Sequence, residues 1–215
     1  MFAIFFHPNL TKSVRVFARN EYLIAFMISC IGMNTTDVRF DEHVLATFKS
    51  FIGKKMTKYE HVPFRFTNSV PQFVRFCIDG NPWYLYCFSE EHDYFGATED
   101  VSVLYFDSNE YPFFAEKQCI SNPIDEVIEK VVVVQENQRL YENNRLLYDV
   151  WITRGLIFDF GDHQISFEKG PWLSEQIVIR KGYNLISEFT PESKIMEPFS
   201  NNGVMNCERT IITIC

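Results

Sequence analysis

The chain has 215 residues, of which 28 are acidic and 20 are basic, so its formal net charge is −8. Apolar residues make up 47% and charged residues 22%, a globular composition that excludes a disordered chain. The acidic balance argues against nucleic-acid binding, because phosphate backbones recruit basic surfaces. The longest apolar run, Tyr22–Met33, is about half the length that spans a bilayer. We therefore expect neither a nucleic-acid nor a membrane partner.

The six cysteines are scattered along the chain, and no two of them have the spacing CxxC. A structural zinc site needs closely spaced ligand pairs, so no metal held by cysteine is expected. Residues 1–8 lack the basic segment and cleavage site of a secretory signal. These features predict a cytoplasmic protein with reduced thiols and no metal or other cofactor.

The first elements expected along the chain are two strands and a helix. Val14–Arg19 alternates apolar and polar residues, as a half-buried strand does, and Tyr22–Ile31 is continuously apolar, as a central strand is. Asp41–Ile52 carries an apolar stripe at helical spacing. Asp41 suits the N-cap, and Gly53 suits the left-handed turn that follows a helix.

Phe73–Phe88 predicts an antiparallel hairpin that turns within Asp79–Pro82. One face of this hairpin is entirely apolar and the other is mixed, which is the pattern of a sheet with one buried face. The apolar face holds Val74, Phe76, Ile78, Trp83, Leu85 and Cys87, and the mixed face holds Phe73, Arg75, Cys77, Tyr84, Tyr86 and Phe88. Because Cys77 and Cys87 lie on opposite faces, we expect no disulfide between them.

A second helix is predicted to begin at Asn122-Pro123, where Asn caps the helix and Pro occupies its first position. One interpretation extends this helix to about Tyr148. The β-branched run Val131–Val134 weakens that interpretation. A short helix, a strand at the valines and a second helix also fit the pattern.

Leu156–Glu168 predicts a second hairpin that turns at Gly161-Asp162, with glycine in the first central position of a type II′ turn. Leu156, Phe158, Ile165 and Phe167 share one face, and Ile157, Asp159, Gln164 and Ser166 share the other. Ile177–Ile179 and Thr210–Ile214 are further short strands. The predicted fold is α+β, with antiparallel hairpins packed against two main helices in one domain over residues 1–215. An alternative divides the chain into two lobes near residue 118.

The sequence contains no motif of a known catalytic site, neither a phosphate-binding glycine loop nor a nucleophile elbow nor HExxH. The densest polar group is Ser89–Asp93, and a second group comprises Asp159, Asp162 and His163. Solvated loops and turns explain both groups, because neighbouring residues on extended backbone diverge. No catalytic or metal-binding residue is therefore predicted.

One segment has an unusual charge pattern. Residues 76–116 contain no Lys or Arg but hold nine acidic and twelve aromatic residues. This pattern suggests a non-catalytic protein whose acidic, aromatic surface binds a basic protein partner, as a toxin-neutralising immunity protein does. The partner-binding residues expected from it are Tyr84, Tyr86, Glu90, Glu91, Asp93 and Tyr94. The alternative function is a small hydrolase or metal-assisted enzyme with its site in the loop 89–93.

Overall fold

The computed structural model describes residues 35–61, 73–94, 97–109, 119–170, 174–195 and 203–215. The chain separates into two compact units, residues 1–33 and residues 34–215, and every described residue belongs to the second. The strands predicted at Val14–Arg19 and Tyr22–Ile31 lie outside the described residues.

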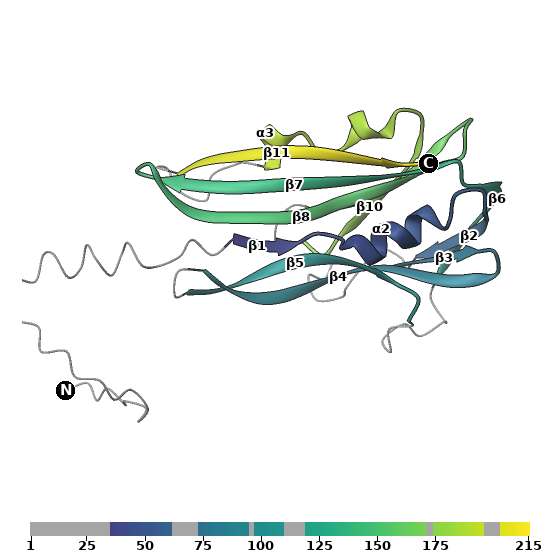
Figure 1. Ribbon diagram of the computed structural model, residues 1–215, viewed down its shortest axis with the longest axis horizontal. Helices are drawn as coiled ribbons and strands as arrows, with labels where there is room; N and C mark the ends of the chain where they lie inside the picture. The colour runs from purple at the N-terminus through teal and green to yellow at the C-terminus, as the bar shows by residue number, and fades with distance from the viewer. Residues whose placement is uncertain (1–34, 62–72, 95–96, 110–118, 171–173, 196–202) are drawn as a thin grey trace, which may run out of the picture. The chain divides into compact units, whose positions relative to one another are not determined.

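Residues 34–215 form two sheets, drawn as two layers in Figure 1. The first sheet runs in the order β10 (Ile177–Gly182), β9 (Gln164–Lys169), β8 (Arg145–Asp159), β7 (Lys130–Glu142) and β11 (Gly203–Ile214). The second runs in the order β5 (Ala97–Asp107), β4 (Asn81–Tyr94), β3 (Phe73–Ile78), β2 (Lys55–His61) and β6 (Ile120–Val127). Neighbouring strands in both orders are antiparallel, and β1 (Thr35–Val38) joins the first sheet by parallel pairing with β8.

The apolar faces of the two sheets pack against each other. Phe76 of β3 contacts Phe158 of β8 and Phe167 of β9, with ring centroids 5.2 and 4.9 Å apart, and all three side chains are buried. Both predicted hairpins have the expected faces, because Phe76 pairs with Trp83 and Phe158 pairs with Ile165. A core rich in phenylalanine therefore lies between the sheets.

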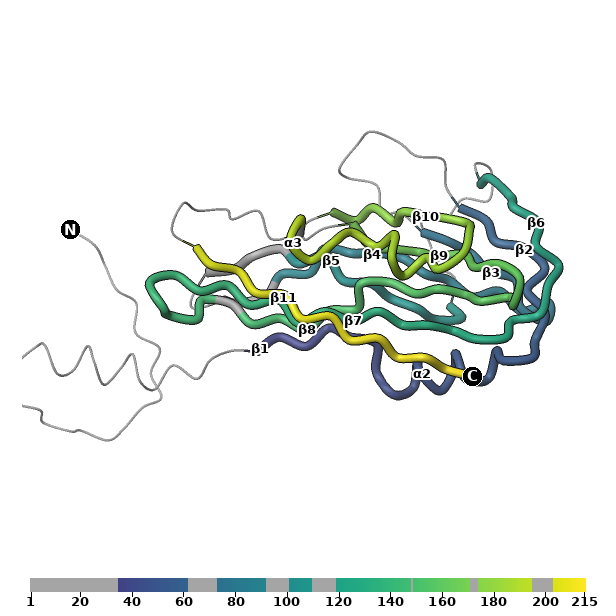
Figure 2. Tube along the Cα trace, turned by 90° about the horizontal axis from the view of Figure 1, so that it is seen from above, coloured from purple at the N-terminus to yellow at the C-terminus, as the bar shows by residue number. Residues whose placement is uncertain are grey.

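The predicted helix at Asp41–Ile52 is confirmed as α2 (Glu42–Lys49). Asp41 caps it by accepting a hydrogen bond from the Val44 N–H at 2.9 Å. Phe48 and the following Phe51 are buried against the second sheet. Figures 1 and 2 together show α2 along one side of the two sheets, where it covers the edge of their shared core.

The α+β prediction is wrong, because the described helices other than α2 are the short α3 (Glu192–Ile195) and the 3-10 helix η2 (Leu185–Glu188). The predicted helix from Asn122 to Tyr148 is instead β6, β7 and the start of β8. Pro123 is tolerated because β6 is an edge strand, which needs hydrogen bonds to a neighbour on one side only. The N–H that proline lacks is therefore not needed for pairing with a second strand. Asn143 and Asn144, with φ of 50° and 61°, form the tight turn between β7 and β8.

The second predicted turn has the expected form. Gly161 has a φ of 91°, Asp162 is not among the residues with positive φ, and the Phe160 N–H donates to the His163 carbonyl at 3.0 Å. This geometry fits a II′-like turn. The predicted strands at Ile177–Ile179 and Thr210–Ile214 are also confirmed, as parts of β10 and β11.

We predict that Phe158→Ala lowers the free energy of unfolding by about 3–5 kcal/mol, because the lost ring leaves a cavity between two sheets that cannot collapse fully. Urea denaturation measures this loss. Tyr183→Ala is the control, since Tyr183 is 77% exposed and its removal should change stability by less than about 0.5 kcal/mol. Equal effects of the two variants would show that the inter-sheet core is misplaced.

Candidate functional site

The segment predicted to bind a partner lies on the long hairpin of β4 and β5. Ser89–Asp93 is not a loop: it belongs to β4 and pairs with β5 as far as Tyr94 and Ala97. Side chains alternate along a strand, so this register puts the positions of Tyr84, Tyr86, Glu90 and Tyr94 on one face and those of Glu91 and Asp93 on the other. The structure therefore groups four of the six predicted positions and separates two.

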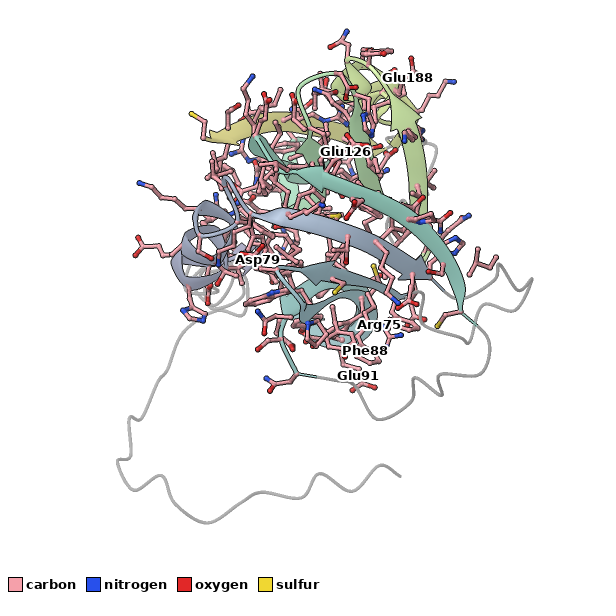
Figure 3. All side chains as sticks on the ribbon, turned by 90° about the vertical axis from the view of Figure 1, so that its right-hand side faces the viewer. Arg75, Asp79, Phe88, Glu91, Glu126 and Glu188 are labelled. Carbon is pink, nitrogen blue, oxygen red and sulfur yellow. The ribbon has the colours of Figure 1, made fainter. Side chains whose placement is uncertain are left out.

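Tyr84 and Tyr86 belong to a packed aromatic layer on the side of the second sheet that faces away from the first. Their exposed fractions are only 4% and 8%. Tyr86 stacks on Tyr105 at 5.4 Å between ring centroids and donates a hydrogen bond to Asp107 Oδ2 at 2.7 Å. Phe88 lies on the same side, where Figure 3 labels it, and its ring packs edge to face against the ring of Tyr86. These tyrosines support the sheet and present little surface to a partner.

Acidic positions face one another toward the tip of the same hairpin. The backbone register sets Glu91 opposite Asp100 and His92 opposite Glu99. Glu91 is exposed and Glu90 is partly buried. At the base of this stretch the Ser89 N–H donates to the carboxylate of Glu175 at 3.1 Å, which brings in a further acid. We call Ser89–Tyr94 with Ala97–Ser102 the acidic ribbon.

The alternation along β4 also bears on the enzyme interpretation. By the backbone register, the position of His92 belongs to one face of the strand and the positions of Glu91 and Asp93 belong to the other. Adjacent residues on a strand cannot converge on one substrate atom. The geometry therefore gives no support to a catalytic centre built from residues 89–93.

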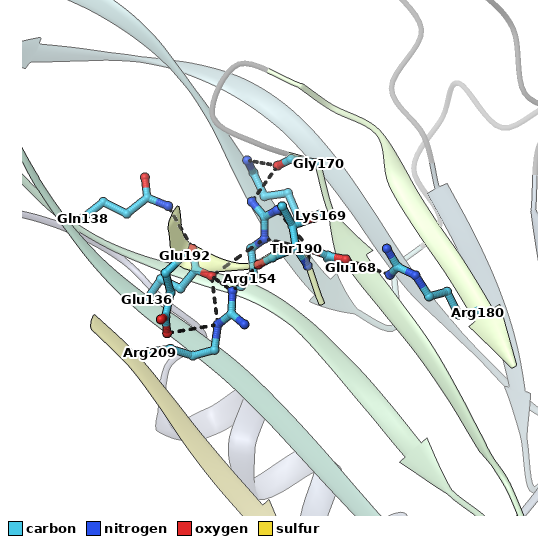
Figure 4. Close-up of polar contacts among 10 residues, drawn as sticks. All are labelled: Glu136, Gln138, Arg154, Glu168, Lys169, Gly170, Arg180, Thr190, Glu192 and Arg209. Atoms are coloured by element: carbon cyan, nitrogen blue, oxygen red, sulfur yellow. Dashed lines mark hydrogen bonds and ion pairs between the residues drawn. The ribbon is translucent and has the colours of Figure 1, made fainter. Parts of the chain in front are cut away.

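The largest group of buried charges among the described residues was not anticipated from the sequence. Figure 4 shows what we call the Arg154 cluster, which consists of Glu136, Arg154, Glu168, Arg180 and Arg209. Arg154 and Glu136 are fully buried, and Glu168 is 1% exposed. The cluster draws one residue from each strand of the first sheet except β1, namely from β7, β8, β9, β10 and β11. The sequence signals for it were charged residues next to apolar ones, as at Glu168 and Arg180, and the polar run Gln135–Arg139 that contains Glu136.

Glu168 is the anion that holds most of this cluster. Its Oε1 accepts from Arg154 Nη2 at 3.0 Å and from the Thr190 N–H at 2.9 Å, and its Oε2 accepts from Arg180 Nη1 at 2.7 Å. Burial alone would raise the pKa of Glu168, but the Thr190 N–H and the two guanidinium groups outweigh burial, so the pKa lies below its ordinary value of 4.5. Glu168 is therefore ionised in the folded protein at neutral pH.

Glu136, the second anion of the cluster, is bound mainly by Arg209 and only distantly by Arg154. Arg209 donates to Glu136 Oε1 at 2.6 Å and to the Thr190 carbonyl at 2.7 Å, whereas Arg154 Nε lies 3.9 Å from Glu136 Oε1. Arg154 is the extra residue of a β-bulge, because Val134 pairs with Gly155 while Gln135 pairs with Thr153. A side chain at Gly155 would strike the Phe167 carbonyl, so only glycine lets β8 and β9 approach at the bulge.

Lys169 lies beside the Arg154 cluster, since Lys169 Nζ and Arg154 Nη1 both donate to the Gly170 carbonyl, at 3.2 and 3.1 Å. Burial lowers the pKa of Lys169 to about 8, and burial raises the pKa of Cys87 to about 12. A thiol with a raised pKa is a poor nucleophile. Cys77, Cys87, Cys119, Cys207 and Cys215 have reduced thiols, while Cys30 lies outside the described residues.

The second polar group from the sequence is partly assembled by the turn between β8 and β9. Asp159 accepts hydrogen bonds from the Gly161 N–H and from Gln164, each at 2.9 Å. Asp162 does meet His163, and so does Glu126 of β6, which the sequence did not connect with them.

Comparison of the chain with protein-family models, with curated proteins and with solved structures gives no match. Among the described residues no helix is long and apolar enough to cross a membrane. The residues and their geometry are therefore the basis for proposing a function.

We predict that Glu168→Gln destabilises the protein more than Arg154→Met does. Glu168→Gln leaves two arginines, one of them fully buried, without their anion, which typically costs about 3–5 kcal/mol. Arg154→Met leaves Glu168 with Arg180 and Glu136 with Arg209, so the loss should be smaller. Urea denaturation of the two variants measures the order, and the reverse order would contradict this account of the cluster.

The lowered pKa of Glu168 predicts a specific dependence of stability on pH. A carboxyl whose pKa is lower in the folded state contributes stability that is present above its unfolded pKa, here about 4.5, and is lost as the pH falls through the folded pKa. The free energy of unfolding of the wild type should therefore fall more steeply than that of Glu168→Gln between about pH 5 and pH 3. Parallel pH profiles would show that Glu168 is not stabilised as an anion.

Proposed function

We propose that the protein is a non-catalytic interaction protein that binds a basic protein partner through the acidic ribbon. The observation that carries this proposal is the register of β4 and β5, which sets Glu91 opposite Asp100 within a stretch of 41 residues, 76–116, that lacks any Lys or Arg. An immunity protein that neutralises a basic toxin is one form that such a binder takes.

Opposed acidic positions on a hairpin have an energetic cost for the protein alone. Like charges directly across a pair of strands destabilise it, and the 76–116 segment supplies no cation to offset the repulsion. A partner with Lys and Arg side chains would relieve this repulsion on binding. It would also be steered to the ribbon by long-range attraction, which raises the association rate.

The aromatic residues have a different role in this proposal from the one expected from sequence. Tyr84 and Tyr86 are buried, so they hold the base of the ribbon in place and contribute little contact area. Direct contact would come from carboxylates such as Glu91, which is exposed. Tyr86→Ala is consequently a poor test of binding, because it would remove packing from the fold as well.

We predict that the triple variant Glu90→Gln, Glu91→Gln, Asp93→Asn associates with the partner about tenfold more slowly at low salt and retains its folding stability. The partner is first isolated from the native cell by cross-linking at low ionic strength and then produced as a pure protein. Surface plasmon resonance across a salt series measures the association rate, which for the wild type should fall as salt screens the ribbon.

A matched variant controls for the loss of net charge. Glu42→Gln, Glu129→Gln, Glu188→Gln also removes three negative charges, here from exposed carboxylates on other surfaces, and Figure 3 shows Glu188 on the far side of the two sheets from Glu91. Its association rate should stay close to that of the wild type. An acidic partner, or an affinity indifferent to salt, would overturn the proposed function.

A further inference from the structure

Three side chains with metal-binding atoms meet where the edge strand β6 passes the turn between β8 and β9. They are Glu126, Asp162 and His163, and one ligand atom from each lies within 4.8 Å of the others. His163 Nδ1 is 2.7 Å from Asp162 Oδ1 and 3.4 Å from Glu126 Oε2. Glu126 belongs to β6 of the second sheet, whereas Asp162 and His163 lie in the turn between two strands of the first sheet. Only the tertiary structure brings the three residues together.

We propose that Glu126, Asp162 and His163 bind one divalent transition-metal ion at this corner. The inference concerns a place distinct from the acidic ribbon and does not depend on the proposed function. The ion would connect β6 of the second sheet to the β8–β9 hairpin of the first, and solvent would complete its coordination because Asp162 and Glu126 are 83% and 38% exposed.

The imidazole of His163 is held firmly for a residue in a turn. The ring is stacked on Phe160, with centroids 5.2 Å apart and planes inclined by 26°, and only 9% of the residue is exposed. The hydrogen bond from the Phe160 N–H to the His163 carbonyl fixes the backbone. These contacts restrict the rotamers of the His163 side chain while Nδ1 lies next to the two carboxylates. Less side-chain entropy is therefore lost when an ion binds.

Glu126 approaches the same nitrogen from a position where an apolar residue would be expected. Exposure alternates along β6, with Asp125 and Val127 outward and Ile124 and Glu126 on the inward side. Ile124 packs against the inter-sheet core, as this pattern requires. Glu126 places a carboxylate on the inward side of the strand, where it meets His163.

The local charge favours a cation. One ring nitrogen, His163 Nδ1, lies close to both carboxylates, and their negative charges attract a cation to the space between the three ligand atoms. The hydrogen bond with His163 lowers the pKa of Asp162, so that carboxyl is ionised at neutral pH. Glu129 adds a further carboxylate, since its Oε1 lies 2.6 Å from where a Cβ on Gly161 would be. His163 Nε2 is buried and has no hydrogen-bond partner among the described residues, so the polar contacts of the ring are all at Nδ1.

The ligand set indicates the kind of ion. Imidazole nitrogen with two carboxylate oxygens suits Zn²⁺, Mn²⁺ or Co²⁺, whereas Ca²⁺ and Mg²⁺ prefer oxygen ligands alone. Three protein ligands with open positions also fit a first-row ion that keeps water.

The test is metal binding to the full-length protein after chelator treatment. Calorimetric titration with ZnCl₂ and with MnCl₂ should show one equivalent bound at this site, and CaCl₂ and MgCl₂ should bind at least about tenfold more weakly. Because the ion would cross-link two sheets, saturating Zn²⁺ should raise the melting temperature by about 5 °C. The absorption spectrum of the Co²⁺ form separates this site from the cysteines, since thiolate ligands give a strong near-ultraviolet charge-transfer band that nitrogen and oxygen ligands lack.

Glu126→Gln should weaken Mn²⁺ binding at least about tenfold and abolish the rise in melting temperature. Glu126 is partly exposed, so this variant keeps the test valid if the more buried His163→Gln fails to fold. Asp125→Asn is the matched control, because Asp125 is the outward neighbour of Glu126 and pairs with Lys55 instead. It should bind the metal as the wild type does. Absence of binding at millimolar metal, binding unchanged in Glu126→Gln, or a thiolate spectrum would each overturn the proposal.

Discussion

The packing of two apolar sheet faces is the constraint on which the rest of residues 34–215 depends. Each sheet buries one face, and the rings of Phe76, Phe158 and Phe167 meet where those faces touch. A strand has only two faces, so once the apolar face is buried, all other chemistry must lie on the outer faces, the edges or the turns. The aromatic layer, the acidic ribbon and the Glu126–His163 corner occupy these remaining places.

The Arg154 cluster obeys this rule but is buried, because Glu168 lies on the face of β9 opposite Phe167 and the backbone of Thr190 contacts Glu168 and Arg209 there. Such a cluster contributes little net stability, since desolvation offsets much of the attraction between its members. It does restrict how the strands can pair, because a shift in register would separate buried charges from their partners. The bulge at Arg154 and the glycine after it are the local features that let β8 carry this side chain into the cluster.

The two proposed binding places differ in how they obtain their charge. The acidic ribbon comes from one stretch of sequence, and the backbone positions of Glu91 and Asp100 lie opposite each other because antiparallel pairing folds that stretch back on itself. The corner at His163 takes one residue from β6 and two from a turn 36 positions later, so it exists only when both sheets are assembled. A ribbon of this kind suits recognition of a large basic surface, whereas the corner is large enough for a single ion.

The sequence by itself determined the elements whose signals are local. Asp41 caps α2 and Gly53 has a positive φ in the turn after it. The alternation in Phe73–Phe88 and Leu156–Glu168 was sufficient to assign the buried face of both hairpins. It misassigned 122–148, because Asn-Pro and a polar run resemble a helix start when the strands that pair with them are unknown.

Only the tertiary structure decided that Pro123 lies on an edge strand and that the polar run of β7 is buried, since both depend on neighbours far away in sequence. The same holds for the candidate sites. The charge of the ribbon was visible in the sequence, whereas the burial of Tyr84 and the meeting of Glu126 with His163 were set by packing between strands that no local pattern encodes.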